Sequence, residues 1–161
     1  MAKFQEVYEQ YCKSVYRYLL SLSGSEDLAE ELLQETFYQA FLHIDQFEGR
    51  SSLYTWLCQI GKNAWLKECR RNRRFTGDSL EKLVLFSHDL PPETLFLKKE
   101  EYHRVRQAVL NLPEPYRDVF ILHVYGDVKL KEIAASYGKS ESWAKVTYYR
   151  ARQQILKEVA Q

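Results

Sequence analysis

The segment from Lys129 to Arg152 has the pattern of two helices that meet at a sharp corner. In its first part, apolar side chains recur at i, i+3, i+4 and i+7, the spacing of one buried helical face. These residues are Leu130, Ile133, Ala134 and Tyr137. Gly138 follows, and because glycine has no Cβ it ends a helix in the left-handed conformation at little cost. Ser140 is then placed to cap a second helix, so the segment predicts a helical hairpin with its corner at Gly138.

The second predicted helix has two different faces. The apolar face is formed by Ala144, Tyr148, Ala151 and Ile155. The other side carries polar, aromatic and cationic residues, namely Ser142, Trp143, Lys145, Val146, Tyr149, Arg150, Arg152 and Gln153. Such a face suits a helix in the DNA major groove, where cations hold phosphates and a few side chains reach base edges. We interpret the segment as a helix-turn-helix; the alternative is an amphipathic hairpin with a solvated basic face.

The remainder of the chain also predicts helices. Of its 161 residues 45% are hydrophobic, with only six Gly and four Pro, and apolar side chains recur at helical spacing nearly throughout. The periodicity is lost between residues 76 and 94, where the sequence suggests one short apolar helix, Leu80 to Phe86. We therefore expect an all-α fold of two small helical domains, 1–75 and 95–161, joined by a flexible linker at 76–94. The helix-turn-helix lies in the second domain.

The net charge of +1 hides a strong segregation of charge along the chain. The segment 22–48 contains seven acidic residues and no Lys or Arg. The segment 49–75 contains seven Lys or Arg against the single acidic residue Glu68. This division predicts one surface for a basic partner, and it predicts cationic surfaces for polyanions at 49–75 and in the last helix.

The acidic cluster raises the alternative of an enzyme or metal site built on Glu30, Glu31 and Glu35. A di-iron site requires paired E-x-x-H motifs on facing helices, and the chain has one such motif, Glu100 to His103. Three cysteines, Cys12, Cys58 and Cys69, show no C-x-x-C spacing and are expected to be free thiols. With no nucleophile–base pair or phosphate-binding loop in view, we expect a non-enzyme with no cofactor, no metal and no small-molecule substrate. No signal segment or apolar run of about 18 residues is seen, which favours a cytoplasmic location.

A loop at residues 47–52 leads into a third predicted helix in which aromatic and cationic residues alternate. Ser51 or Ser52 is expected to cap this helix, which ends in the basic run from Lys67 to Arg74. Its polar and cationic residues are Lys62, Asn63, Lys67, Arg70 and Arg71. Together with Trp56 and Trp65 they fit a platform for unstacked bases beside a phosphate track. The alternative is that the tryptophans are core residues, which we expect of at least one of them.

Three segments carry a family resemblance. DLAEELLQETFYQAFLHIDQF and FEGRSSLYTWLCQIGKNAWLKECRR resemble region 2 of the extracytoplasmic-function (ECF) sigma factors of bacterial RNA polymerase. LPEPYRDVFILHVYGDVKLKEIAASYGKSESWAKVTYYRAR resembles their region 4. The resemblance implies an initiation factor that binds core polymerase and recognises promoter DNA at the −10 and −35 elements. It covers nearly the whole chain apart from the linker.

The resemblance also implies roles for individual residues. The acidic helix would dock on the clamp helices of the polymerase β′ subunit through Asp27, Glu30, Glu31, Gln34 and Glu35. The −10 strand would be held by Asn63 and by the loop of Glu48, Gly49, Arg50, Ser51 and Ser52. The −35 duplex would be read by Lys145, Val146, Tyr149, Arg150 and Arg152. The chain departs from many relatives at Val146–Thr147, at Trp143 and at Gly61, where Ala is frequent.

The same resemblance implies restraint by an anti-sigma factor that covers these surfaces, and in the family such factors are often membrane-bound. A different interpretation of the helix-turn-helix is a dimeric transcriptional regulator that acts without a sigma role. Such a regulator would bind a two-fold palindromic operator without polymerase. The sequence leaves both readings open, and transcription with core polymerase discriminates between them.

Overall fold

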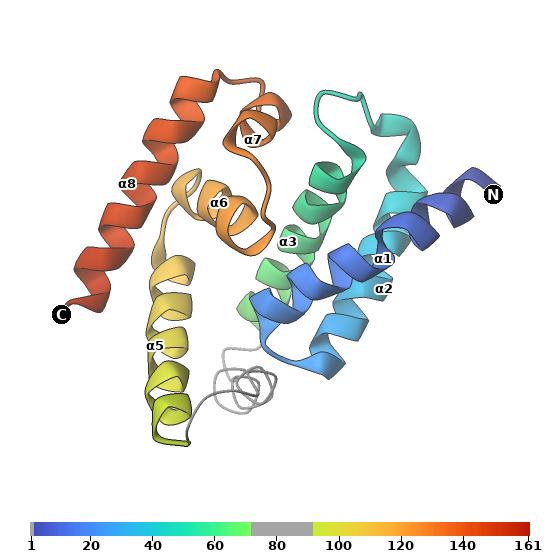
Figure 1. The fold of residues 1–161 in the computed structure, drawn as a ribbon. Coiled ribbons are helices and arrows are strands. Elements are labelled where there is room, and N and C mark those ends of the chain that lie inside the picture. The colour runs from blue at the N-terminus through green and yellow to red at the C-terminus, as the bar shows by residue number, and fades with distance from the viewer. Residues whose placement is uncertain (1, 72–91) are drawn as a thin grey trace.

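The computed structural model describes residues 2–71 and 92–161, and within these the side chains of 3–71 and 100–161. All regular elements of the described residues are helical (Figure 1). They are α1 (Ala2–Ser23), α2 (Glu26–His43), the short 3₁₀ turn η1 (Ile44–Gln46), α3 (Leu53–Arg71), α5 (Pro92–Asn111), α6 (Tyr116–Phe120), the π-helical turn η2 (Ile121–Tyr125), α7 (Leu130–Ser136) and α8 (Glu141–Val159). The prediction of an all-α fold is confirmed. The short helix expected at Leu80 to Phe86 lies outside the described residues.

The N-terminal domain is formed by α1, α2 and α3, which all contact one another. Its core contains Val15, Leu19, Leu22 and Leu57, each at most 1% exposed. Trp65 is also buried in this core, as expected of at least one of the two tryptophans, whereas Trp56 is half-buried beside Phe47. Serine hydroxyls cap two of these helices, and the cap of α3 is one of the two serines predicted from the sequence. The Ser25 hydroxyl caps α2 through the Leu28 amide, and the Ser52 hydroxyl accepts a hydrogen bond from the Thr55 amide at the start of α3.

The C-terminal domain is formed by α5 to α8. Helix α8 contacts α5, α6 and α7, and the core contains Val119, Ile121, Leu122, Ile133, Ala151 and Ile155. The predicted helix-turn-helix is present in α7 and α8. Gly138 has φ +66°, and Ser140 caps α8 by accepting a hydrogen bond from the Trp143 amide. Helix α5 begins at Pro92, earlier than the Leu95 expected from the sequence.

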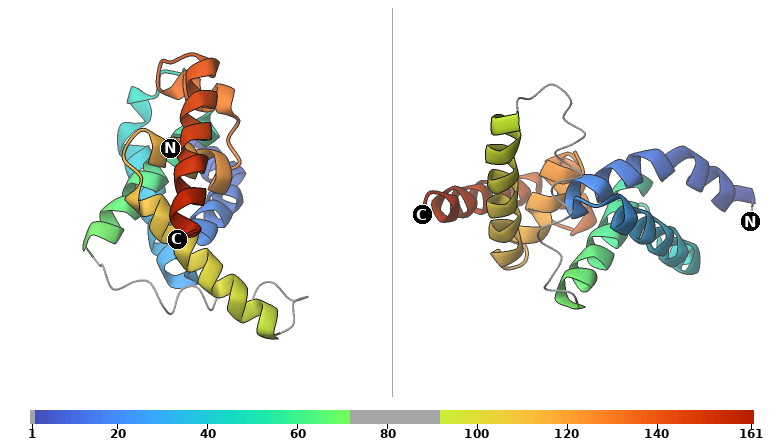
Figure 2. Two further views of the ribbon diagram at one scale, coloured as in Figure 1. Left: turned by 90° about the vertical axis from the view of Figure 1, so that its left-hand side faces the viewer. Right: turned by 90° about the horizontal axis from the view of Figure 1, so that it is seen from below.

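The two domains pack against each other, which the sequence did not predict. Helix α3 contacts η2 and α7, and α1 contacts η2, so η2 and α7 of the C-terminal domain lie along one side of α3. The view from below in Figure 2 shows α5 and α8 on one side of this junction and α1 and α2 on the other. This packing decides which of the predicted site residues face solvent.

Candidate functional site

The acidic residues of α2 share one exposed face. Asp27, Glu30, Glu31, Gln34 and Glu35 are all exposed, and we call this set the acidic face. Burial on the opposite side of α2 fixes its orientation, because Leu28, Leu32 and Thr36 point into the core. The negative potential reaches α1, where the pKa of the Tyr16 phenol is raised by partial burial and then by the carboxylates of Glu26, Glu30 and Asp27. The structure therefore gathers the predicted polymerase-binding residues on one surface.

An apolar patch continues the acidic face toward the end of α2. Tyr38 is 58% exposed, Phe41 44% and Leu42 50%. The Phe41 ring is only partly covered, by Phe4 at a centroid distance of 5.2 Å. Exposed aromatic and aliphatic residues beside charged ones are typical of protein-binding surfaces. The signal available in the sequence was the spacing of Tyr38, four residues after Gln34 on the same face.

A groove of about 710 Å³ runs between the exposed edges of α2 and α3. Glu31 and Glu35 line its α2 side, while Asn63, Lys67 and Arg71 line its α3 side. Its apolar lining includes Leu28, Leu32, Trp56, Ile60 and Ala64. The groove thus places the predicted base-reading Asn63 and two cations opposite two carboxylates, and separates them from the side of α3 that meets the C-terminal domain.

The loop before α3 is exposed at its tip. Gly49 adopts φ +73°, and Glu48 and Arg50 form an ion pair at 2.8 Å with both side chains mostly in solvent. Such a pair is expected to contribute little to stability. Ser51 is half-buried, and the Ser52 amide donates a hydrogen bond of 2.8 Å to Glu132 Oε2 of α7. One end of the predicted −10 loop is therefore in contact with the other domain.

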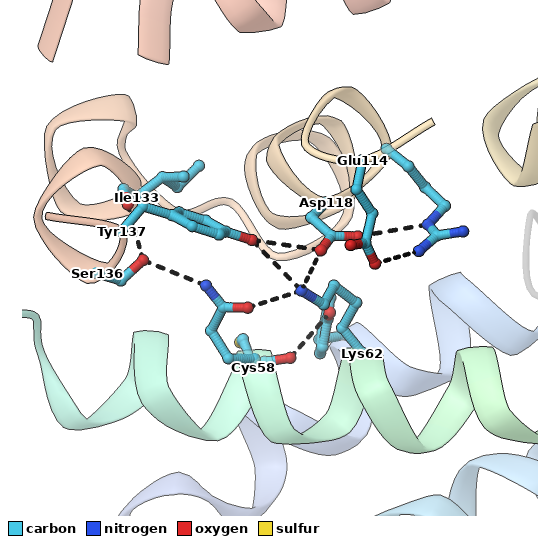
Figure 3. A network of polar contacts seen from close by, with 10 residues as sticks. Cys58, Lys62, Glu114, Asp118, Ile133, Ser136 and Tyr137 are labelled. Atoms are coloured by element: carbon cyan, nitrogen blue, oxygen red, sulfur yellow. Dashed lines mark hydrogen bonds and ion pairs between the residues drawn. The ribbon is translucent and has the colours of Figure 1, made fainter. Parts of the chain in front are cut away.

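The polar and cationic residues predicted on α3 lie in two environments. Asn63, Lys67, Arg70 and Arg71 are exposed, and we call this set the basic face. Lys62 is instead 2% exposed, with its Nζ 3.0 Å from Asp118 Oδ2 of α6 (Figure 3). Burial lowers the pKa of Lys62, and the Asp118 carboxylate partly offsets that effect. In this arrangement of the domains, Lys62 is not on the surface predicted to hold DNA.

The outer side of α8 is free of the interdomain contact. Ser142, Lys145, Val146, Tyr149, Arg150 and Arg152 are exposed, and we call this set the recognition face. Trp143 is half-buried against Tyr137, with ring centroids 5.6 Å apart. Thr147 is buried, so of the two departures at 146 and 147 only Val146 faces solvent. On the inner side Tyr148 stacks on Phe120, with ring centroids 6.0 Å apart, and fixes the orientation of the helix.

The potential metal ligands, the thiols and the helices of the described residues bear on other classes of site. No group of three His, Cys, Asp or Glu in the described part of the chain could hold a metal ion. Cys12, Cys58 and Cys69 are free, and burial raises the pKa of the Cys58 thiol to about 12 and that of Cys69 to about 11. None of the helices in the described ranges is long and apolar enough to cross a bilayer.

Comparisons with known proteins agree with this division into two domains. Residues 7–75 match the Sigma-70 region 2 family and residues 102–155 match the Sigma-70 region 4 family. The chain is 30% identical over 153 residues to the ECF RNA polymerase sigma factor SigM of Bacillus subtilis, covering 93% of this chain and 91% of that protein. It is 31% identical over 142 residues to EcfG of Rhodopseudomonas palustris, covering 88% and 77%.

Two solved structures share the fold. One is CnrH in complex with the cytosolic domain of CnrY, with a TM-score of 0.60 and 21% identity over 96% of this chain and 85% of that chain. The other is RpoE of Bartonella quintana in complex with the anti-sigma factor NepR, with a TM-score of 0.57 and 23% identity over 99% and 98%. The match to SigM spans almost the whole of both proteins. The chain belongs to the ECF sigma factor family of bacterial RNA polymerase.

Proposed function

We propose that this sigma factor divides promoter recognition among the acidic face of α2, the basic face of α3 and the recognition face of α8. The observation that supports this most directly is that each face is exposed on its own helix and has the charge its partner requires. The acidic and basic faces border the same groove on opposite sides. The domains would be residues 1–75 for polymerase and −10 binding and 95–161 for −35 binding, joined by 76–94.

The acidic face would bind core polymerase through the clamp helices of the β′ subunit. Charge complementarity accelerates such an encounter and selects the partner, whereas affinity comes mostly from well-packed apolar contacts. The adjoining exposed patch of Tyr38, Phe41 and Leu42 supplies such contacts next to the carboxylates. We therefore extend the docking surface beyond the residues indicated by charge alone.

The basic face and the loop at 48–52 would act on the melted −10 strand. Opening a duplex costs about 1.4 kcal/mol per stacked step, while a stacked base returns about 1–3 kcal/mol. One short helix cannot recover the cost of melting several steps by itself. Binding energy from polymerase is therefore needed, which is why the protein would act as an initiation factor rather than as an enzyme.

The recognition face would read the −35 element as duplex DNA. Lys145, Arg150 and Arg152 are exposed on α8 together with Val146 and Tyr149. This set combines phosphate-binding cations with side chains that can contact base edges or a thymine methyl group. With Val146 and a half-buried Trp143 at positions where many relatives differ, we expect a −35 preference unlike the commonest one.

Restraint by an anti-sigma factor is the second part of the proposal. One of the two similar structures is of CnrH with the cytosolic domain of CnrY, and the other is of the sigma factor RpoE with the anti-sigma factor NepR. The family resemblance implies the same kind of restraint here. An inhibitor of this chain would cover the acidic and basic faces, and it could be membrane-bound while the sigma factor itself stays in the cytoplasm.

Reconstituted transcription tests the proposal. The chain is added to purified core polymerase of the same source on promoters found by mapping start sites after overexpression. We expect specific transcripts that depend on both proteins. A dimeric regulator would instead bind a palindromic operator tightly without polymerase and give no such transcript. That outcome would overturn the proposed function.

A further inference from the structure

We infer that the Asp118 carboxylate occupies the position beside Lys62 that a promoter phosphate would take. Closure of the two domains and capture of the −10 strand therefore compete for the same ammonium group. This inference deepens the proposed function and rests on it, because it takes α3 as the helix that holds the −10 strand. Lys62, which the sequence predicted to hold that strand, would join the basic face when the domains separate. The geometry that carries it is the contact network between α3 and the C-terminal domain.

The Lys62 ammonium group has a complete set of hydrogen-bond acceptors in the closed arrangement. Its Nζ lies 3.0 Å from Asp118 Oδ2, 2.7 Å from Gln59 Oε1 and 3.5 Å from the Tyr137 hydroxyl (Figure 3). An ammonium group has three protons to donate, so no donor is left for DNA. Arg117 Nε lies 3.4 Å from Asp118 Oδ1, on the other oxygen of the same carboxylate.

Further contacts cover the start of α3 in the same way. The Tyr54 hydroxyl donates a hydrogen bond of 2.8 Å to the Gly126 carbonyl oxygen, and the Ser52 amide donates one to Glu132. The Gln59 side-chain amide donates a third, of 3.2 Å, to the Ser136 hydroxyl. Lys62 and Ser52, both predicted to hold the −10 strand, are therefore occupied by the C-terminal domain. The recognition face of α8 is left exposed.

The contact that closes the domains is suited to reversible exchange. Removing both charges from water offsets much of the attraction between Lys62 and Asp118, so a buried ion pair contributes little net stability. The lowered pKa of Lys62 has the same origin in burial. When the domains separate, water and a phosphate can replace the carboxylate. The closed form would thus withhold the Lys62 ammonium group and the Ser52 amide from the −10 strand, while leaving the recognition face of α8 available.

The experiment measures binding of a fluorescein-labelled oligothymidylate, about 20 nucleotides long, by fluorescence anisotropy at low salt. The variant Asp118→Asn keeps the shape of the side chain and removes its charge. We expect it to bind roughly threefold to tenfold more tightly than the wild type, with a salt slope steeper by about 0.7, the value for one additional phosphate contact on a single strand. Small-angle X-ray scattering should show a larger radius of gyration for the free Asp118→Asn variant than for the free wild type.

Controls separate competition from a general change in charge. Glu101→Gln removes an exposed carboxylate from the same domain and should change affinity by less than about twofold. Adding Lys62→Gln to Asp118→Asn should abolish the gain. Tyr54→Phe removes one interdomain hydrogen bond with no change in charge, and should shift the affinity in the same direction as Asp118→Asn even if the latter folds poorly.

Two results would overturn the inference. One is an equal effect of Asp118→Asn and Glu101→Gln, and the other is a gain that survives the loss of the Lys62 ammonium group. Neither of these binding measurements requires polymerase. Failure of reconstituted transcription would therefore reject the sigma role while leaving the competition between Asp118 and single-stranded DNA in place.

Discussion

Gly61 of α3 lies so close to Leu19 of α1 that a Cβ added to the glycine would stand 3.1 Å from Leu19 Cδ2. The same Cβ would stand 3.3 Å from Thr36 Oγ1, and the Thr36 hydroxyl is fixed by a hydrogen bond of 2.6 Å to the Leu32 carbonyl oxygen. A glycine inside a helix lowers helix propensity relative to the Ala that is frequent at this position, unless a close approach of a neighbour offsets the loss. The structure identifies that approach as the packing of α3 on α1 and α2.

Gly61→Ala is therefore expected to destabilise the N-terminal domain. The gain in helix propensity is about 1 kcal/mol, but overpacking a rigid core costs about 1–3 kcal/mol. We expect a net loss of about 1 kcal/mol in the free energy of unfolding, measured by urea denaturation. A gain of about 1 kcal/mol would show that Leu19 and Thr36 can move aside.

Gly138→Ala should destabilise the C-terminal domain through the backbone. Gly138 has φ +66°, which a residue with a Cβ adopts at a cost of roughly 1–2 kcal/mol. Gly138→Asn should cost less, because Asn tolerates this conformation better. Thermal unfolding of the two variants should rank wild type above Asn and Asn above Ala. Equal stability of all three would contradict the role of this corner.

Alkaline pH should destabilise the protein through the Cys58 thiol. Its pKa is raised from 9.0 to about 12 by burial, so between these values the folded state binds more protons than the unfolded state. The contribution of this thiol to the free energy of unfolding is fully present below pH 9 and is lost as the pH rises toward 12. At pH 10.5 the loss is about 2 kcal/mol. The loss of unfolding free energy between pH 8 and pH 10.5, measured by denaturation, should be smaller for Cys58→Ala than for the wild type. Equal losses would exclude the Cys58 thiol as the cause.

Tyr38→Ala should weaken binding to core polymerase without affecting folding. The ring is 58% exposed, so its removal should change stability by less than about 0.5 kcal/mol. As an aromatic contact beside the acidic face, it should contribute about 1–2 kcal/mol to docking. Tyr102→Ala, at a residue 43% exposed on α5, serves as the control in a pull-down titration with core polymerase. Equal affinities of the two variants for core polymerase would show that the apolar patch is not part of the docking surface.

Local signals in the sequence predicted the helices and most of the exposed faces. Ser25, Ser140 and Gly138 act within a few residues of their own position, and the charges at 22–48 and 49–75 mark the faces of α2 and α3 directly. The closed packing could not be predicted in this way. Lys62 has the pattern of an exposed cation, and only the fold brings Asp118 of a distant helix to it. The burial of Thr147, by contrast, follows from helical spacing, because it lies three residues after Ala144 and four before Ala151, which are both buried.

The division of promoter recognition between α3 and α8 is tested most directly by one crossed transcription measurement. Arg150→Ala and Asn63→Ala are each assayed with core polymerase on an intact promoter and on the same promoter mismatched through the −10 element. Arg150→Ala should weaken promoter binding by about 1–3 kcal/mol on both templates if it reads a guanine edge in the −35 duplex.

Asn63→Ala should reduce activity on the intact promoter, and this loss should shrink on the mismatched template, where the strands are already open. Binding of an isolated −35 duplex should be unaffected by Asn63→Ala. An Arg150→Ala variant that is fully active on the intact promoter would contradict the assignment of −35 recognition to α8. An Asn63→Ala loss that is equal on both templates would contradict its role in promoter opening.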